Sequence, residues 1–256
     1  METMKEKLKR GEMVMVCGMG RVCHHNIVQM LGVHGGFDAV WLDQEHAGLS
    51  FETLEIAAMA ARAHGMDSFV RLAPTDYATV TRCYEAGAGG IMAAQIESAA
   101  QAEEIVQWAK FHPRGHRGLN GSGFDGHYGN SPAAEFCERA NRDLFVAIQI
   151  ETTGALEQCD EIAAIDEVDL LFVGPADLSQ NLGITGQFDN PKLHEAIERV
   201  AAACKNHGKN WGIVPASPAM ADRCVELGCK MLVPVADVKI LNAGIRASKE
   251  AYAKYF

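Results

Sequence analysis

Two carboxylates, an amide and a histidine occupy one short segment of this sequence, WLDQEH at residues 41–46, directly after an apolar run. Strands more commonly end in Gly, Asn or Pro than in two acids and an imidazole. Carboxylates and an imidazole that lie close together can bind a cation, transfer a proton, or do both. Asp43, Glu45 and His46 are therefore candidate functional residues.

Polar side chains stand in comparable positions in three other apolar runs. Arg71 lies within FVRLA, Gln149 and Glu151 end LFVAIQIE, and Asp177 follows LLFVGPA. The alternation of a strand would place the branched residues of LFVAIQIE on one face, and Gln149 and Glu151 on the other. An unpaired carboxylate buried on that inner face is costly, so Glu151 calls for a cation or a proton.

Glu151 and Asp177 together offer hard oxygen ligands, and Mg²⁺ or Mn²⁺ with several waters is the natural occupant of such a site. Taken singly, each carboxylate is better explained as a helix cap or as the partner of an Arg. Arg71 alone would be a structural ion pair, and His46 alone an ordinary hydrogen-bonded histidine. The two carboxylates opposite Arg71 and His46 favour a site, in which Arg71 would bind an anionic substrate.

Short apolar runs that recur along the chain would position these residues. Helical patterns separate most of them, such as 50–65, with Ser50 as the expected N-cap, and 216–229, with Gly228 at the helix end. This alternation predicts a (β/α)₈ barrel; the alternative, a doubly wound open sheet, usually has fewer strands and a Gly-rich phosphate turn after the first one. The expected strands lie at 13–18, 39–43, 68–73, 90–95, 144–151, 170–176, 211–216 and 230–236.

The whole chain, 1–256, is predicted to form one barrel domain, because it contains no linker and no low-complexity tract. Residues 1–10 predict a short leading helix. The longest interval between strands, 112–142, contains six Gly between 115 and 129. We expect it to form an ordered excursion or a lid, with a helix from about Pro132 to Ala140.

The composition restricts the class of partner and the compartment. Hydrophobic residues make up 48% of the chain, and the formal net charge is −10 with no basic run after the N-terminus. This charge argues against nucleic acid or an anionic membrane surface as the main partner. The eight Cys form no CxxC pair, no signal-peptide core is evident, and no segment reaches the ~18 apolar residues of a membrane span. We expect a cytoplasmic protein that acts on a small molecule.

The positions of the lysines bear on how a carbonyl group would be activated. None of them lies at the C-terminal end of a predicted strand. A Schiff-base mechanism is therefore not expected, and activation of a carbonyl group would fall to a metal ion. No GxSxG motif or Cys/His pair indicates an acyl-enzyme, although Cys17, near the end of the first strand, leaves that alternative open.

The segments LDQEH, FVRLA, IQIET and GPADLS, in this order, resemble the HpcH/HpaI aldolase family, the metal-dependent class II pyruvate aldolases. The similarity runs from about Gly11 to the final helix, and IQIET together with GPADLS is its most specific part. The resemblance implies a barrel that assembles as a homohexamer, with the C-terminal helix packing on a neighbouring subunit. In the sequence, Val238, Leu241, Ile245 and Tyr252 form an apolar stripe on that helix, for which packing on the chain's own barrel is the alternative.

The resemblance also implies roles for single residues. Glu151 and Asp177 would bind the divalent metal (Mg²⁺ or Mn²⁺, possibly Co²⁺), and His46 would be the acid/base group. Asp43 and Glu45 would order metal-bound waters. The implied substrate-binding residues are Arg71 and Gln149 for the oxo acid, the backbone amides of Ala176 and Asp177 for its carboxylate, and Gly174 and Val214 in the pocket wall. Glu85, where Asp is usual, would support the histidine across a subunit interface.

Two departures from the family pattern lie in loops that the resemblance places beside the aldehyde half of the substrate. Gln44 replaces the usual small residue, and the first loop, GMGRVCHHN, carries Arg21, His24 and His25 where a more apolar or hydroxylic loop is expected. The RGxGS-type segment reads RGLNGS at 117–122.

The expected reaction is reversible cleavage of a 4-hydroxy-2-oxo acid to pyruvate and an aldehyde through a metal-stabilised enolate. A citramalyl- or malyl-CoA lyase is one alternative, and it would need basic residues at a groove for CoA, such as those of 114–117. A non-catalytic barrel that binds pyruvate or a related oxo acid is the other. His46 together with Arg71 argues against it, because a binding protein does not require an acid/base group.

Overall fold

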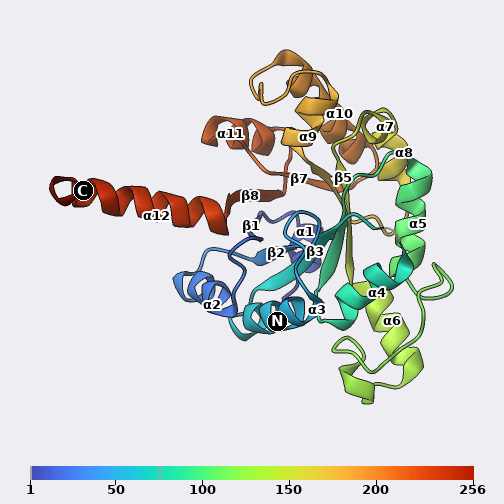
Figure 1. The fold of residues 1–256 in the computed structure, drawn as a ribbon. Helices are drawn as coiled ribbons and strands as arrows, with labels where there is room; N and C mark the ends of the chain where they lie inside the picture. Colours follow the sequence, from blue (N-terminus) through green and yellow to red (C-terminus); the bar gives the residue numbers. More distant parts are fainter. Residues whose placement is uncertain (1, 75) are drawn as a thin grey trace.

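Eight parallel strands close into a barrel in the computed structural model, which describes residues 2–74 and 76–256 (Figure 1). The strands follow chain order around the barrel, and β1 pairs with β8, so the open-sheet alternative is wrong. All eight predicted strands are confirmed. They are β1 Val14–Met19, β2 Ala39–Asp43, β3 Asp67–Leu72, β4 Gly90–Ala93, β5 Phe145–Ile150, β6 Leu170–Val173, β7 Asn210–Ile213 and β8 Met231–Ala236.

The strands have two apolar faces, as buried parallel strands require. Along β5, Val146, Ile148 and Ile150 belong to the core between barrel and helices, whereas Phe145 and Ala147 belong to the barrel interior. Large side chains fill the interior toward the N-terminal ends of the strands. The interior cluster includes Met4, Leu8, Trp41, Phe69, Met92, Phe172 and Met231.

Helices surround the barrel and follow the predicted caps. Ser50 accepts a hydrogen bond from the Thr53 amide (3.2 Å) at the start of α3, and Gly228 follows α11 with φ +92°. The helices are α1 Met4–Lys9, α2 His25–His34, α3 Phe51–Ala63, α4 Tyr77–Glu85, α5 Ala99–Ala109, α6 Ala133–Asp143, α7 Thr153–Glu157, α8 Cys159–Ala164, α9 Pro175–Asn181, α10 Pro191–Asn206, α11 Pro218–Glu226 and α12 Asp237–Ala251. Short 3₁₀ turns lie at η1 His127–Gly129 and η2 Ala253–Tyr255.

The predicted leading helix, α1, covers the N-terminal end of the barrel. Met4 and Leu8 enter the interior cluster, and the Met4 amide donates to Asp67 Oδ2 (3.0 Å) at the start of β3. This end is therefore closed, and the C-terminal ends of the strands form the open end.

The long segment between α5 and α6 lies at the closed end. The Phe124 amide donates to the carbonyl of Glu85 (2.9 Å), the last residue of α4. Arg117 pairs with Asp125 at 2.5 Å, and its guanidinium lies 5.0 Å from the Tyr84 ring centroid. The segment is thus an ordered excursion that ends in a helix, and the expectation of a lid over this chain's own strand ends is wrong.

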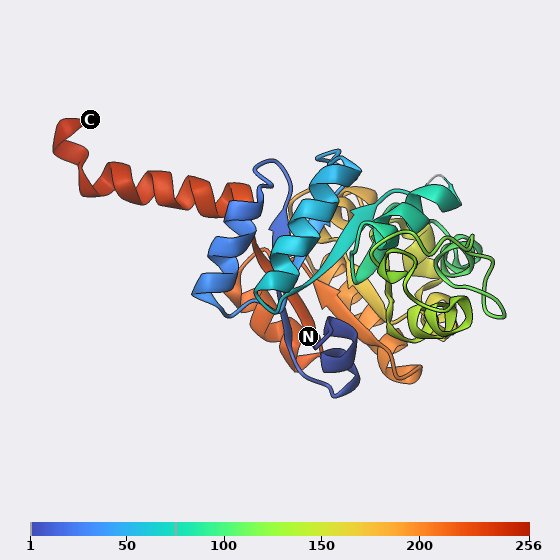
Figure 2. The ribbon, with the colours of Figure 1, turned by 90° about the horizontal axis from the view of Figure 1, so that it is seen from below.

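The last helix, α12, extends away from the barrel (Figures 1 and 2). Its apolar stripe, Val238, Leu241, Ile245 and Tyr252, is 38–61% exposed. Beyond the first turn of α12, this stripe therefore does not pack on the chain's own barrel, whereas packing on a neighbouring subunit stays a prediction. None of the helices formed by the described residues is both long and apolar enough to cross a membrane.

Candidate active site at the open end of the barrel

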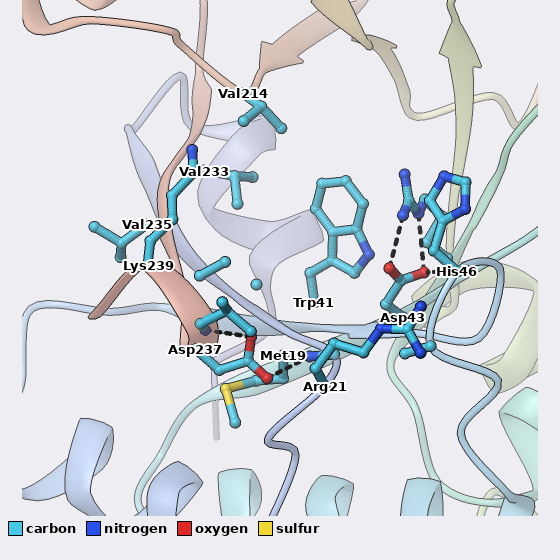
Figure 3. A pocket seen from close by; sticks show the side chains of 16 residues that line it. Met19, Arg21, Trp41, Asp43, His46, Val214, Val233, Val235, Asp237 and Lys239 are labelled. Carbon is cyan, nitrogen blue, oxygen red and sulfur yellow. Dashed lines mark hydrogen bonds and ion pairs between the residues drawn. The ribbon is translucent and has the colours of Figure 1, made fainter. Parts of the chain in front are cut away.

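Two adjoining cavities occupy the open end of the barrel. The first, of about 380 Å³, lies between the ends of β1, β2 and β8 and is shown in Figure 3. The second, of about 270 Å³, lies over β5, β6 and β7. Trp41, Arg71, Val214 and Lys239 line both cavities and so form their boundary.

Arg71 is held by two carboxylates from the end of β2. Its Nη2 and Nε lie 2.7 and 3.1 Å from the two oxygens of Asp43, and its Nε lies 3.2 Å from Glu45 Oε2. The guanidinium also lies 4.6 Å from the centroid of the Trp41 ring. Arg71 therefore makes the structural ion pair considered above and, in the same position, presents its charge to both cavities.

Asp43 also shapes the turn that follows β2. Its Oδ1 accepts hydrogen bonds from the amides of Glu45 (3.2 Å) and His46 (3.3 Å). A short acidic side chain commonly stabilises a turn in this way. WLDQEH is thus a strand end that turns on an aspartate instead of on Gly or Asn.

Gln44 points out of the site. Its Nε2 donates to the Leu49 carbonyl (3.2 Å), and Cys83 Sγ donates to its Oε1 (3.8 Å). The residue that departs from the family pattern therefore holds the loop after β2 against α4, and it lines neither cavity.

His46 is on the wall of the first cavity, and its side chain is 61% exposed. Its Nε2 lies 3.9 Å from Glu45 Oε2, which also contacts Arg71. The imidazole is thus accessible to a substrate and stands beside a carboxylate, as proton transfer requires.

Glu151 is fully buried at the end of β5. Its Oε1 accepts from the backbone amide of Gln95 (2.8 Å) and from the Gln95 side chain (3.1 Å), and its Oε2 accepts from Gln149. Burial, together with the nearby charges of Glu45 and Asp177, raises the pKa of Glu151 to about 7, although the Gln95 amide and Arg71 oppose this shift. This carboxylate is the one for which the sequence required a cation or a proton.

Asp177 lies in the first turn of α9 and lines the second cavity with Gln149. It is not the N-cap of that helix, because Gly174 occupies the cap position. The Asn181 side chain donates to the carbonyl oxygens of Glu151 and Asp177 (3.0 Å each) and so connects the two chain segments.

The residues fit a divalent cation to which the protein supplies only some of the ligands. No three His, Cys, Asp or Glu residues converge on one point within the described part of the chain. Glu151 and Asp177 would therefore supply two oxygen ligands and leave positions for water and substrate, as Mg²⁺ permits. The buried Gln149 Oε1 has no hydrogen-bond partner among the described residues, and it too faces the second cavity.

Gly174 brings the β6–α9 turn against these groups. A Cβ atom at this position would lie 2.5 Å from Glu151 Oε2 and 2.6 Å from Gln149 Nε2. Only a glycine allows the backbone to approach so closely. Ala176 and Val214, the other expected pocket residues, line the second cavity as well.

Three expected contributors do not reach this site within the chain. Glu85 ends α4 at the closed end, where its carboxylate accepts from Asn120 (3.3 Å), and residues 117–122 lie in the same region. A role for Glu85 beside His46 therefore requires a second subunit and stays a prediction. Arg114 pairs with Glu103 and Arg117 with Asp125, so the 114–117 segment places no basic residues at the cavity.

Lys239 is a site residue that the pattern of polar strand ends does not predict. It lies in the first turn of α12, three positions after β8, and it lines both cavities. It follows the last residue of its strand, where the other candidates lie. Site residues can also be predicted from the first turn of the helix that follows each strand.

Comparison with known proteins agrees with this geometry. The model of a family described as HpcH/HpaI aldolase/citrate lyase matches residues 24–242. The 4-hydroxy-4-methyl-2-oxoglutarate aldolase tasA of Hapsidospora irregularis is 34% identical over 219 residues, which cover 81% of this chain and 77% of that protein. A hydroxypyruvate/pyruvate aldolase of Pseudomonas aeruginosa is 30% identical over 242 residues, with coverage of 94% and 89%. The crystal structure of an HpcH/HpaI aldolase from Desulfitobacterium hafniense is 33% identical and has a TM-score of 0.90, with 98% of each chain covered.

Proposed function

This chain belongs to the HpcH/HpaI aldolase/citrate lyase family, and we propose that it is a divalent-metal-dependent aldolase that cleaves a 4-hydroxy-2-oxo acid reversibly to pyruvate and an aldehyde. One observation carries the proposal. The buried carboxylate of Glu151 stands at the same end of the barrel as Asp177, which lines the second cavity together with Arg71 and Gln149. An oxo acid needs a cation and hydrogen-bond donors at such a position.

The proposed division of labour follows from the positions of the residues. A divalent ion, Mg²⁺ or Mn²⁺ with Co²⁺ as a further candidate, would be held by Glu151 and Asp177 and would polarise the 2-oxo group. Gln149, with the backbone amides of Ala176 and Asp177, would orient the oxo acid in the second cavity. Arg71 would stabilise the enolate oxygen, because two carboxylates fix its guanidinium before the substrate arrives.

Cleavage breaks the bond between C3 and C4. The 4-hydroxyl group loses its proton and becomes the aldehyde, while C3 gains a proton and becomes the methyl group of pyruvate. His46 would accept the hydroxyl proton, since its ring is exposed on the cavity wall. In the condensation direction the same ring would return that proton.

Removal of the metal or of its buried ligand tests the proposal. EDTA and Glu151→Gln should each abolish both the aldol reaction and the exchange of pyruvate methyl protons in D₂O, and added Mn²⁺ should restore only the EDTA-treated protein. The exchange is followed by NMR without any aldehyde. Borohydride added with pyruvate should leave the mass of the protein unchanged. Full activity after EDTA treatment, or a reduced covalent adduct, would contradict the mechanism.

The same measurements separate the two alternative functions. Pyruvate binding without proton exchange would favour a non-catalytic oxo-acid-binding barrel. Cleavage of citramalyl- or malyl-CoA, with no aldol product from pyruvate and aldehydes, would favour an acyl-CoA lyase.

The proposed assembly is a homohexamer in which α12 packs on a neighbouring subunit. The exposed apolar side chains of Leu241 and Ile245 on a helix that leaves its own barrel support this proposal. Glu85 would then approach a neighbour's site from the closed end of its own barrel.

A further inference from the structure

Two cationic side chains border the first cavity and have no task in the proposed reaction. Arg21 lies in the loop between β1 and α2, and Lys239 lies in the first turn of α12. Their positions adjoin because β1 pairs with β8, with Gly18 opposite Ala236. Barrel closure thus brings together two residues that are 218 positions apart in the sequence.

The buried carboxylate of Asp237 connects the loop after β1 to the first turn of α12. Asp237 Oδ2 accepts from the amides of Gly20 (2.8 Å) and Val22 (2.7 Å), on either side of Arg21, and its Oδ1 accepts from the Val238 amide (2.7 Å). Asp237 is only 6% exposed. The carboxylate of Asp237, two positions before Lys239, is therefore occupied by backbone amides and fixes the backbone that carries both cations.

Arg21 and Lys239 have no direct polar partner among the residues that the structure describes. Neither side chain has a hydrogen bond or an ion pair with any residue in 2–74 or 76–256, whereas Arg71 in the same cavity is bound to Asp43 and Glu45. Both carboxylate oxygens of Asp43 in turn accept hydrogen bonds from Arg71. Arg21 and Lys239 therefore keep N–H donors at the first cavity that an anionic ligand could occupy.

The wall between these cations is apolar. Figure 3 shows Trp41 between Lys239 and Arg21 in that view, with Val233 and Val214 on the side of Lys239. Met19 and Val235 also line this cavity. Such a wall suits a short carbon chain, and the charged groups at its edge suit an acidic group at the end of that chain.

We propose that the first cavity binds the aldehyde half of the substrate and that this aldehyde is an anion whose acidic group is bound by Arg21 and Lys239. The inference rests on the proposed aldolase function, because the second cavity holds the oxo acid and Lys239 stands at the boundary. A carboxylate and a phosphate share the required chemistry: oxygens that accept from a guanidinium and an ammonium group.

The test compares two anionic aldehydes, each with a neutral partner that lacks the negative charge. Condensation with pyruvate is followed by mass spectrometry for 4-oxobutanoate against its methyl ester, and for glyceraldehyde 3-phosphate against glyceraldehyde. The protein is used as the intact chain, as wild type and as Arg21→Gln, Lys239→Gln and the double variant. Lys249→Gln is the matched control, because it removes a lysine from the same helix about 15 Å further along its axis.

The wild type should favour at least one anion over its neutral partner by about tenfold or more in kcat/KM. Each cavity variant should lower kcat/KM for that anion by about tenfold, mainly through KM, and leave the neutral aldehyde within about twofold. Lys249→Gln should behave as the wild type. The pair that shows the preference identifies the acid as carboxylate or phosphate.

Equal kcat/KM values for charged and neutral partners in the wild type would overturn the inference, as would equal losses for both in the variants. Exchange of pyruvate methyl protons in D₂O, measured without aldehyde, separates the two proposals. Normal exchange without a charge preference would reject the anion subsite alone. Absence of exchange in the wild type with Mn²⁺ would reject the aldolase function on which it rests.

Discussion

Asp43 performs two structural tasks with one carboxylate. It pairs with Arg71 through both oxygens and accepts from the amides of Glu45 and His46. The orientation of the cation and the shape of the turn that carries the imidazole are thus coupled. Gln44, its sequence neighbour, contacts Leu49 and Cys83 outside the cavities. Adjacent residues in one motif therefore serve different layers of the barrel, because side chains alternate along a strand.

Replacement of Asp43 should reveal this coupling. Asp43→Asn removes the charge that holds Arg71, and we expect pyruvate exchange to slow by about tenfold to a hundredfold, since a charge-assisted hydrogen bond contributes about 1.5–3 kcal/mol. Gln44→Ala is the control and should leave the exchange rate within about twofold. The rate is the decay of the pyruvate methyl proton signal in D₂O, followed by NMR. Similar losses in both variants would show that the turn acts only through folding.

Gly174 gives a second prediction at this scale. The methyl group of Gly174→Ala would meet Glu151 Oε2 at 2.5 Å, so the carboxylate must shift from its present position. We expect the barrel to fold, with Mn²⁺ affinity reduced by at least about tenfold in calorimetric titration, because ligand position determines affinity. Gly121→Ala, where an added Cβ meets nothing within 4 Å, should bind Mn²⁺ like the wild type. Unchanged affinity in Gly174→Ala would argue against Glu151 as a ligand.

At the scale of elements, a buried lysine connects α5 to α6 at the closed end of the barrel. Lys110, at the C-terminus of α5, is fully buried and donates to the carbonyl oxygens of Asn141 (2.8 Å) and Leu144 (3.0 Å) at the end of α6. It also forms an ion pair with Glu167 at 3.1 Å. A cation at this position satisfies helix C-terminal carbonyls that would otherwise lose hydrogen bonds on burial.

Lys110 should make the free energy of unfolding depend on pH. Burial, first, and the charge of Lys5 lower its pKa from an ordinary 10.5 to about 8. Between about pH 8 and pH 10.5, Lys110 is therefore protonated in the unfolded chain and deprotonated in the folded chain. Its contribution to the free energy of unfolding rises with pH in this range, by at most about 1.4 kcal/mol per pH unit.

Lys110→Met should remove this contribution. The difference in unfolding free energy, wild type minus variant, should grow in favour of the wild type from pH 8 to pH 10, as measured by urea denaturation. Lys192→Met, an exposed substitution at the start of α10, should show no such trend. A wild-type minus Lys110→Met difference that is constant over this range would contradict the lowered pKa.

For the whole molecule, the projecting helix α12 would link the proposed assembly to the site. Its first turn carries Asp237 and Lys239 at the cavity, while Leu241 and Ile245 further along are 50% and 49% exposed. A neighbouring subunit that covers those side chains would also hold the first turn in place. Assembly and the geometry of the first cavity should therefore change together.

Charge placed on the stripe tests this link. The double variant Leu241→Glu, Ile245→Glu should lower the mass measured by light scattering from that of a hexamer, because burial of two carboxylates in an apolar interface is costly. Arg246→Glu adds a carboxylate on another side of the helix and should leave the mass unchanged. A wild type that is monomeric at micromolar concentration would refute the proposed assembly.

The sequence by itself determined the barrel and most of the candidate site. Strand positions followed from apolar runs, because parallel strands are buried on both faces. The inward direction of Gln149 and Glu151 followed from the two-residue period of β5. Arg71 and Asp177 were found because the ends of parallel strands meet at one end of a barrel. These are local regularities that a single sequence displays.

Only the tertiary structure decided which distant residues share a cavity and how their charges are balanced. The contact of Asp237 with Gly20 joins residues 217 positions apart, and it exists because β1 and β8 close the barrel. The same closure brings Arg21 toward Lys239, while the path of α4 carries Glu85 to the opposite end. The raised pKa of Glu151 likewise depends on burial and on Glu45 and Asp177. Burial and electrostatics depend on the distances between segments, and closure of the barrel sets those distances.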